Sequence, residues 1–153
     1  MSKFYCCFQG AALIKNPQLD SFAEYFLDYK PEKWMGGSGD GVFSFESDSG
    51  DRCDLSILES KDYGISVSYN IRGSGERRGK EYYSVSDMEK INDVEDVGDD
   101  QFAPVGSFLP PQEAWLALED FFNNPLCKSA RIKWINSCLL YTSDAADDMQ
   151  CVD

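Results

Sequence analysis

The sequence predicts an α+β fold, an antiparallel β-sheet meander of about six or seven strands with two helices packed on one face. Three observations indicate this class. Residues 63–71 alternate strictly between large apolar and small or polar side chains, as in a strand with one buried face. Neighbouring β-prone segments are separated by short turns rich in glycine and aspartate. Residues 17–29 and 112–122 instead repeat apolar residues at helical spacing.

The N-terminal part of the chain predicts a strand followed by the first helix. Residues 3–9 are aromatic and β-prone, which favours a strand. Asn16 and Pro17 suit the cap and the first position of a helix, so we expect a helix over 17–29 that ends before Pro31. One side of this helix is apolar and carries Leu19, Phe22, Ala23 and Phe26.

Four strand candidates follow in the middle of the chain, at residues 42–46, 53–59, 63–71 and 81–85. In the third candidate we expect the large side chains to be buried and the intervening residues to face water, namely Gly64, Ser66, Ser68 and Asn70. The glycine-rich segments 34–41 and 73–79 lack the following helix that phosphate-binding loops require. We interpret both segments as connections.

The C-terminal part predicts a strand, a helix and a closing strand. An apolar pair at 108–109 leads to Pro111, which suits a first helical position because no N–H is needed there. Residues 112–122 carry a wide, aromatic apolar stripe that must lie against a sheet, and the helix stops at 123–125. The alternation at 132–134 indicates the closing strand.

The last residues are interpreted as non-native. Residues 138–147 read CLLYTSDAAD and resemble the direct translation of a transposon sequencing adapter, and the match resumes at 151–153. A native acidic tail is the alternative. We therefore expect a single domain over 1–136 and an adapter-derived tail over 137–153, which is left out of fold reasoning. The tail holds four aspartates and no lysine or arginine, so the net charge changes from −13 for the whole chain to −9 without it.

Charge and composition restrict the classes of partner that we expect for this chain. A strongly acidic chain disfavours nucleic acid and anionic membranes as partners, and it favours either solubility or a basic partner. No stretch approaches the ~20 apolar residues of a membrane-spanning helix, and we expect a cytoplasmic protein. The cysteines outside the tail lack C-x-x-C spacing, so we expect small buried apolar residues, with the adjacent Cys6 and Cys7 on opposite faces of a strand. The other two are Cys53 and Cys127.

No catalytic signature is present in the sequence. The chain has no histidine, which excludes Ser-His-Asp and Cys-His arrangements and histidine metal ligands. Carboxylates are so numerous that no pair of them indicates glycoside chemistry, and their spacing lacks the calcium-loop pattern. We therefore expect no enzymatic activity, no cofactor and no metal.

Residues 87–100, called the acidic connection below, contain seven acidic residues and one lysine. Such a run usually forms a solvated connection. Alternatively, its carboxylates imitate phosphates and dock into the basic groove of a protein that acts on nucleic acid, with fast association. In that interpretation the binding residues are Asp93, Glu95, Asp96, Asp99 and Asp100.

Four motifs occur in a fixed order along the chain. They are an N-P-x-L-x-x-F helix start, a sheet-forming middle, a G-x-x-L-P-P-x-E-A segment whose helix ends in a phenylalanine pair, and a closing I-x-W strand. The residues that carry them are Asn16, Pro17, Leu19, Phe22, Gly106, Leu109, Pro110, Pro111, Glu113, Ala114, Phe121, Phe122, Ile132 and Trp134. Together they resemble the first-numbered family of bacterial immunity proteins from polymorphic toxin systems. The turn at 124–128 departs from the longer basic or glycine turn of many members.

The resemblance implies a cytoplasmic antidote that binds a cognate toxin domain, often a nuclease or deaminase, and inhibits it stoichiometrically. The toxin-binding residues would then be those of the acidic connection, with Tyr82 or Trp34 as exposed aromatic anchors. The Leu-Pro-Pro segment and Trp134 are assigned to packing. A small-molecule-binding or regulatory α+β module with no toxin partner is the alternative, and a DNA mimic is a third possibility.

Overall fold

The computed structural model describes residues 2–10, 12–34, 40–76, 79–91, 94–96 and 102–137. The helical elements, with η marking a 3-10 turn, are η1 (Leu19–Phe22), α1 (Ala23–Phe26), η2 (Pro31–Trp34), η3 (Met88–Lys90), η4 (Val105–Ser107) and α2 (Pro111–Asn123). The strands are β1 (Lys3–Phe8), β2 (Ile14–Lys15), β3 (Asp40–Glu46), β4 (Arg52–Ser60), β5 (Gly64–Arg72), β6 (Lys80–Ser84), β7 (Val94–Asp96), β8 (Phe102–Pro104), β9 (Phe108–Leu109) and β10 (Trp134–Asn136). The predicted tail lies outside the described residues, apart from Ser137.

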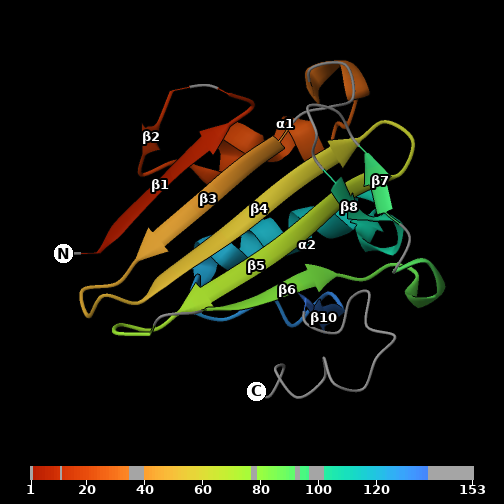
Figure 1. Cartoon of the computed structure of the whole chain (residues 1–153). Helices are drawn as coiled ribbons and strands as arrows, with labels where there is room; N and C mark the ends of the chain where they lie inside the picture. The colour runs from red at the N-terminus through yellow and green to blue at the C-terminus, as the bar shows by residue number, and fades with distance from the viewer. Residues whose placement is uncertain are drawn as a thin grey trace, which may run out of the picture.

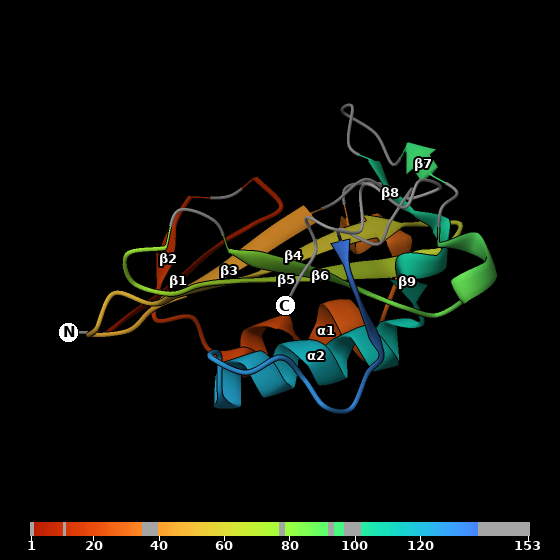
Figure 2. The same cartoon turned by 60° about the horizontal axis from the view of Figure 1, so that its bottom comes forward.

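Eight of these strands form one antiparallel sheet in the order β10-β6-β5-β4-β3-β1-β2, with β9 also paired to β5 (Figure 1). β7 and β8 form a separate two-stranded ladder. Figure 2 shows α1 and α2 side by side on one face of the sheet, with β7 and β8 on the other side. The predicted α+β class and the β3–β6 meander are therefore confirmed, and both helices cover the same face.

β1 shows how alternation assigns residues to the two faces. Cys6 is buried and Cys7 is exposed, as expected for neighbours in a strand. The expectation that all four cysteines are buried was wrong for Cys7, which lies on the face without helices, and for Cys127, which follows α2 in an exposed turn. All four thiols are free.

β5 departs from its predicted alternation. Ile65, Val67 and Tyr69 are buried as expected, but Ser66 and Ser68, expected to face water, are buried as well. For Ser66 the reason is a second layer. The η4 turn lies over this end of β5, and the Ser66 hydroxyl is 2.7 Å from the hydroxyl of Ser107. Alternation along a strand indicates that one face of the strand is buried. Whether a later segment covers part of the other face depends on tertiary contacts.

The first helix is shorter than the predicted 17–29. Asn16 is not its cap, because Asn16 has φ 52° and its N–H donates to the Phe4 carbonyl at 2.7 Å. The Trp34 indole N–H donates to the Tyr25 carbonyl at 2.9 Å, and Lys33 donates to the Glu24 carbonyl. Because these side chains occupy carbonyls that a longer helix would use, α1 ends after Phe26.

α2 follows its prediction closely. Pro111 occupies the first turn, and the helix ends at Asn123, one residue beyond the predicted 112–122. Its apolar stripe is buried against the sheet and consists of Ala114, Trp115, Ala117, Leu118 and Phe121.

The layer between helices and sheet is largely aromatic, with Phe43 of β3 near its centre. Phe43 is fully buried, and its ring centroid lies 5.0 Å from that of Phe22 and 5.7 Å from that of Phe122, both in edge-to-face geometry. Phe8 contacts the same group at 6.1 Å from Phe43. Edge-to-face pairs add to the burial of apolar area, so this cluster holds α1, α2 and the sheet together.

The loop after α2 is fixed by Arg131. Its guanidinium donates to both carboxylate oxygens of Asp120, at 2.6 and 3.0 Å, and to Glu119 at 2.7 Å. The Ser129 hydroxyl donates to Asp120 as well. The Trp134 indole N–H then donates to the Ser129 carbonyl at 2.8 Å, which directs the chain into β10.

Truncation of Phe43 tests the aromatic layer. We expect Phe43→Ala to lower the free energy of unfolding by about 3–5 kcal/mol, because a buried ring is lost and a cavity remains. Val42→Ala, on the opposite face of the same strand, is the control and should change it by less than about 1 kcal/mol. Urea denaturation of both variants measures the difference. Equal losses would contradict the assignment of Phe43 to the core.

Acidification tests the Asp120 interactions. Hydrogen bonds from Arg131, followed by those from Ser129, hold the pKa of the Asp120 carboxyl below its ordinary value. A depressed folded-state pKa contributes stability above the unfolded-state pKa, and that stability is lost as the pH falls through the folded-state pKa. Wild-type protein should therefore lose more unfolding free energy between about pH 6 and pH 2 than Asp120→Asn does. Asp62→Asn, in the exposed β4–β5 turn, is measured beside it as the control for the loss of one surface carboxylate.

Candidate functional site

The sheet face turned away from α1 and α2, called the open face below, carries polar side chains in rows that cross the strands. The register aligns Glu46, Arg52 and Arg72 in one row. The next row holds Ser44, Asp54, Asn70 and Glu81. The third row holds Val42, Ser56, Ser68 and Tyr83. Charge thus changes along the face, from cations at one end to hydroxyls and carboxylates toward the middle.

Most charges in the first two rows are paired. Arg52 contacts Glu46 at 4.0 Å and Asp54 at 3.4 Å. The Ser44 hydroxyl also donates to Asp54, at 2.5 Å. Glu81 differs, since it forms no hydrogen bond or ion pair with any residue in the described part of the chain.

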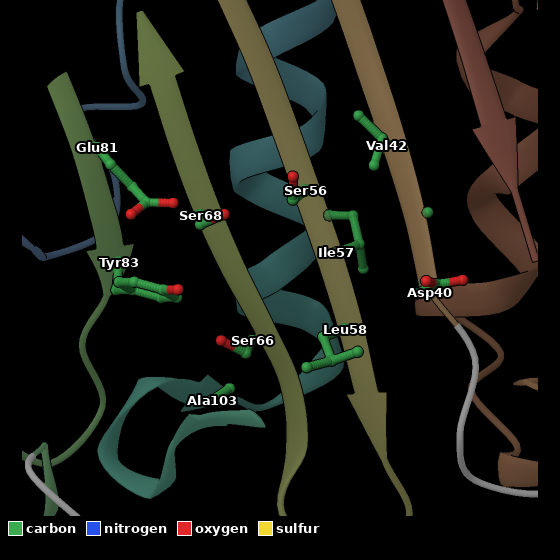
Figure 3. Close-up of a pocket in the computed structure, with 11 residues that line it drawn as sticks. Asp40, Val42, Ser56, Ile57, Leu58, Ser66, Ser68, Glu81, Tyr83 and Ala103 are labelled. Carbon is green, nitrogen blue, oxygen red and sulfur yellow. The ribbon is translucent and has the colours of Figure 1, made fainter. Parts of the chain in front are cut away.

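A hollow of about 300 Å³ lies in the open face over β3, β4, β5 and β6 (Figure 3). We call it the sheet hollow. Its lining residues are Asp40, Gly41, Val42, Ser56, Ile57, Leu58, Ser66, Ser68, Glu81, Tyr83 and Ala103. The volume is at the lower end of small-molecule sites, and the lining is richer in hydroxyls than such sites usually are. A larger hollow of about 480 Å³ at the β1–β2 edge is lined by Lys3 and Lys15, which suit a basic partner poorly.

One end of the sheet hollow is closed by buried hydroxyls. The Val67 N–H donates to the Ser84 hydroxyl at 3.1 Å, and this hydroxyl donates to the Ser107 carbonyl at 2.7 Å. The Ser107 hydroxyl donates to the Pro104 carbonyl at 2.6 Å and contacts Ser66. These bonds hold the β8–η4 segment against the open face, so Ala103 of β8 becomes part of the hollow.

Gly106 anchors the start of the acidic connection. Its carbonyl accepts from the N–H groups of Ser86 and Asp87, at 2.7 and 3.1 Å. A Cβ at this position would lie 2.0 Å from the Asp87 carbonyl oxygen and 2.8 Å from the Ile91 nitrogen, so only glycine fits. Asp87 accepts from the Glu89 N–H and caps η3, and Ile91 is buried beneath it.

The predicted binding residues are only partly described. Glu95 and Asp96 lie on β7, where Glu95 is paired with Ala103 and Asp96 with Phe102. Asp93, Asp99 and Asp100 lie outside the described residues. The pairing places the backbone of Glu95 directly opposite a residue that lines the sheet hollow.

The two predicted aromatic anchors were wrong as exposed residues. Trp34 is fully buried and packs edge-to-face on Phe26, with centroids 5.5 Å apart. Tyr82 is half-buried against the core, and the Lys128 ammonium lies 3.9 Å from its ring centroid. Both side chains pack in or against the core cluster on the helix side.

The sheet hollow itself was not predicted as a site. In the sequence, the best indication of the hollow was the alternation within the strands of the meander. In two neighbouring strands this alternation already places Ser56 beside Ser68 on one face. Glu81 and Tyr83 lie at alternate positions of the next strand and join the same face. Nothing in the local pattern indicated that β8 would close one end.

Three groups with shifted pKa values lie on the helix side, namely Cys6, Cys53 and Tyr29. Burial, followed by the neighbouring Cys7 charge, raises the pKa of the Cys6 thiol to about 11, and burial also raises that of Cys53. Such thiols hold little thiolate at neutral pH and are weak nucleophiles. Burial and a hydrogen bond to the buried Glu59 raise the pKa of Tyr29. Glu59 lies on the core side of β4 and is separate from the sheet hollow.

The described residues contain neither a cluster of metal-binding side chains nor a helix that could span a membrane. No group of three or more cysteine, aspartate or glutamate side chains is arranged to hold a metal ion there. Within the same ranges, no helix is long and apolar enough to cross a membrane.

Comparisons of the chain with protein-family models, with curated proteins and with solved structures each find no match. The resemblance to the immunity family therefore depends on its motif residues alone.

Substitution of Gly106 tests the anchoring of the acidic connection. We expect Gly106→Ala to lower the free energy of unfolding by about 1–3 kcal/mol, because the new Cβ meets backbone atoms that cannot rotate away. Gly73→Ala is the matched control, since its Cβ would meet only the flexible end of Glu76. Urea denaturation and amide spectra of residues 86–91 provide the measurement. An unperturbed Gly106→Ala variant would show that this contact does not hold the connection.

Proposed function

We propose that this chain is an immunity protein, which binds a cognate bacterial toxin domain and inhibits it as a stoichiometric complex. The toxin class that suits it is a nuclease or deaminase, because an enzyme that binds nucleic acid carries a basic groove. Carboxylates from an acidic protein can occupy such a groove and exclude the substrate.

The observation that carries the proposal is the pairing of Glu95 with Ala103. It attaches the strand of the acidic connection to a strand that lines the sheet hollow. β7, the described strand of the acidic connection, and the open face are therefore neighbouring parts of one surface. A continuous surface of this kind is better suited to a protein partner than to a small ligand.

The positions of the motif residues agree with this interpretation. Leu109, Ala114 and Phe121 are buried, Pro111 starts α2, and Gly106 makes a contact that only glycine allows. These residues therefore serve the fold. A binding protein whose shared motif is structural can carry its specificity on other residues, such as those of the open face and the acidic connection.

One observation favours the alternative, a small-molecule-binding or regulatory module. The sheet hollow has about the volume of a small ligand site and offers several hydroxyls for orientation. Its position on an uncovered sheet face argues against this, because small-molecule sites enclose most of the ligand surface. Genes beside this one separate the two proposals, since a secreted toxin gene supports immunity and a metabolic operon supports the module.

The test uses the toxin domain encoded beside this chain. We expect co-expression to rescue cells from the toxin, and we expect the dissociation constant to rise between about 50 and 500 mM salt because charges form the contact. Changing Asp93, Glu95, Asp96, Asp99 and Asp100 to Asn or Gln should weaken binding at least about tenfold and reduce its salt dependence.

The control changes the same number of exposed acids on the helix side, namely Asp20, Glu24, Asp28, Glu32 and Glu113. This variant should bind and rescue like wild type. Rescue by both variants would keep the function and place the interface elsewhere. Absence of any toxin gene nearby, or a folded chain that neither binds nor rescues, would refute the immunity proposal.

A further inference from the structure

Ser68 presents a hydroxyl to the sheet hollow. Ser68 is only 8% exposed, and its side chain lines the hollow. It forms no hydrogen bond with any residue among those described, whereas the neighbouring Ser66 hydroxyl is bonded to Ser107. The Ser68 oxygen keeps access to the hollow, so it is available to bond a ligand that reaches into it.

Glu81 supplies charge beside this hydroxyl. Figure 3 shows the Glu81 carboxylate directed from β6 toward Ser68 on β5. The carboxylate is half-buried and has no ionic partner among the described residues. Partial burial strengthens its attraction for a cation, because the local dielectric is lower than that of water.

The other lining residues determine the charge and the shape of a ligand that fits the hollow. Among the described residues, the lining of the sheet hollow includes two carboxylates, Asp40 and Glu81, and neither lysine nor arginine. Ser56 adds a third hydroxyl acceptor in register with Ser68, and the ring of Tyr83 forms one wall. Acceptors on several sides of an aromatic wall suit a planar group that carries many N–H donors and stacks on rings.

We propose that the sheet hollow receives an arginine side chain from the basic protein that this chain binds. The guanidinium donates to the Glu81 carboxylate and to the Ser68 hydroxyl while it stacks on Tyr83. This inference rests on the proposed function, because it identifies the anchor by which the partner docks on the open face. Glu95 and Asp96 on the neighbouring β7 add negative charge that guides a basic surface to this position.

The first experiment needs no partner. Amide spectra of the isotopically labelled chain are recorded during titration with N-acetyl-arginine methylamide, and separately with the corresponding lysine compound. We expect the arginine compound to bind in about the millimolar range and to shift the amides of Ser68, Glu81 and Tyr83. Glu81→Gln should weaken this binding about tenfold, and Glu113→Gln, an exposed acid on the helix side, should leave it unchanged.

Two results would overturn the inference in this experiment. Shifts spread over the acidic connection without a focus on the hollow would show general charge attraction. Equal binding of the lysine compound would show that the site does not recognise the guanidinium plane. Urea midpoints of the variants confirm that each one is folded before it is compared.

The second experiment uses the toxin domain, and it separates this inference from the proposed function. Glu81→Gln and Ser68→Ala should each weaken toxin binding, the first at least about tenfold, while Glu113→Gln has no effect. Rescue by wild type with unchanged binding of Glu81→Gln would overturn the arginine site and keep the immunity function. Focused binding of the arginine compound in a chain that binds no toxin would support the site and refute the function.

Discussion

The backbone of β5 has hydrogen-bonding groups along both edges, and satisfying them organises the rest of the structure. β4 pairs with β5 along its whole length. The other edge is divided, because β6 pairs with Ser68–Ile71 and β9 pairs with Ile65 and Ser66. Between them, the Val67 N–H donates to the Ser84 hydroxyl. One serine side chain thus joins two short strands into a continuous edge.

This divided edge determines where the remaining segments go. β6 leaves the sheet after Ser84, and the chain must return as β9 to complete the edge of β5. On the way it crosses the open face, where η4 and β8 cover Ser66 and close one end of the sheet hollow. After β9 it continues into α2, on the opposite face, and buries the aromatic layer. The sheet hollow and the aromatic core therefore both follow from the way the backbone edge of β5 is paired.

Function, in the proposal made above, is separate from the features that specify the fold. The phenylalanine pair, the prolines before α2 and Gly106 serve packing and close backbone contacts. The open face holds two side chains that form no hydrogen bond with other described residues, the Glu81 carboxylate and the Ser68 hydroxyl. Such a division lets the binding surface vary while the core stays intact, because the two sets of side chains lie on opposite faces of one sheet.

The sequence by itself determined the fold class, the meander, α2 and the absence of histidine chemistry. Residue periods and proline or glycine positions are local signals, and α2 ended within one residue of its prediction for that reason. The tertiary structure decided the rest. α1 was shortened because the Trp34 indole bonds to a carbonyl within it, and Ser66 was covered by a segment some forty residues later. The sheet hollow combines residues from β3, β4, β5, β6 and β8. Local pattern assigns a side chain to a face, whereas burial and contact on that face depend on which distant segment packs over it.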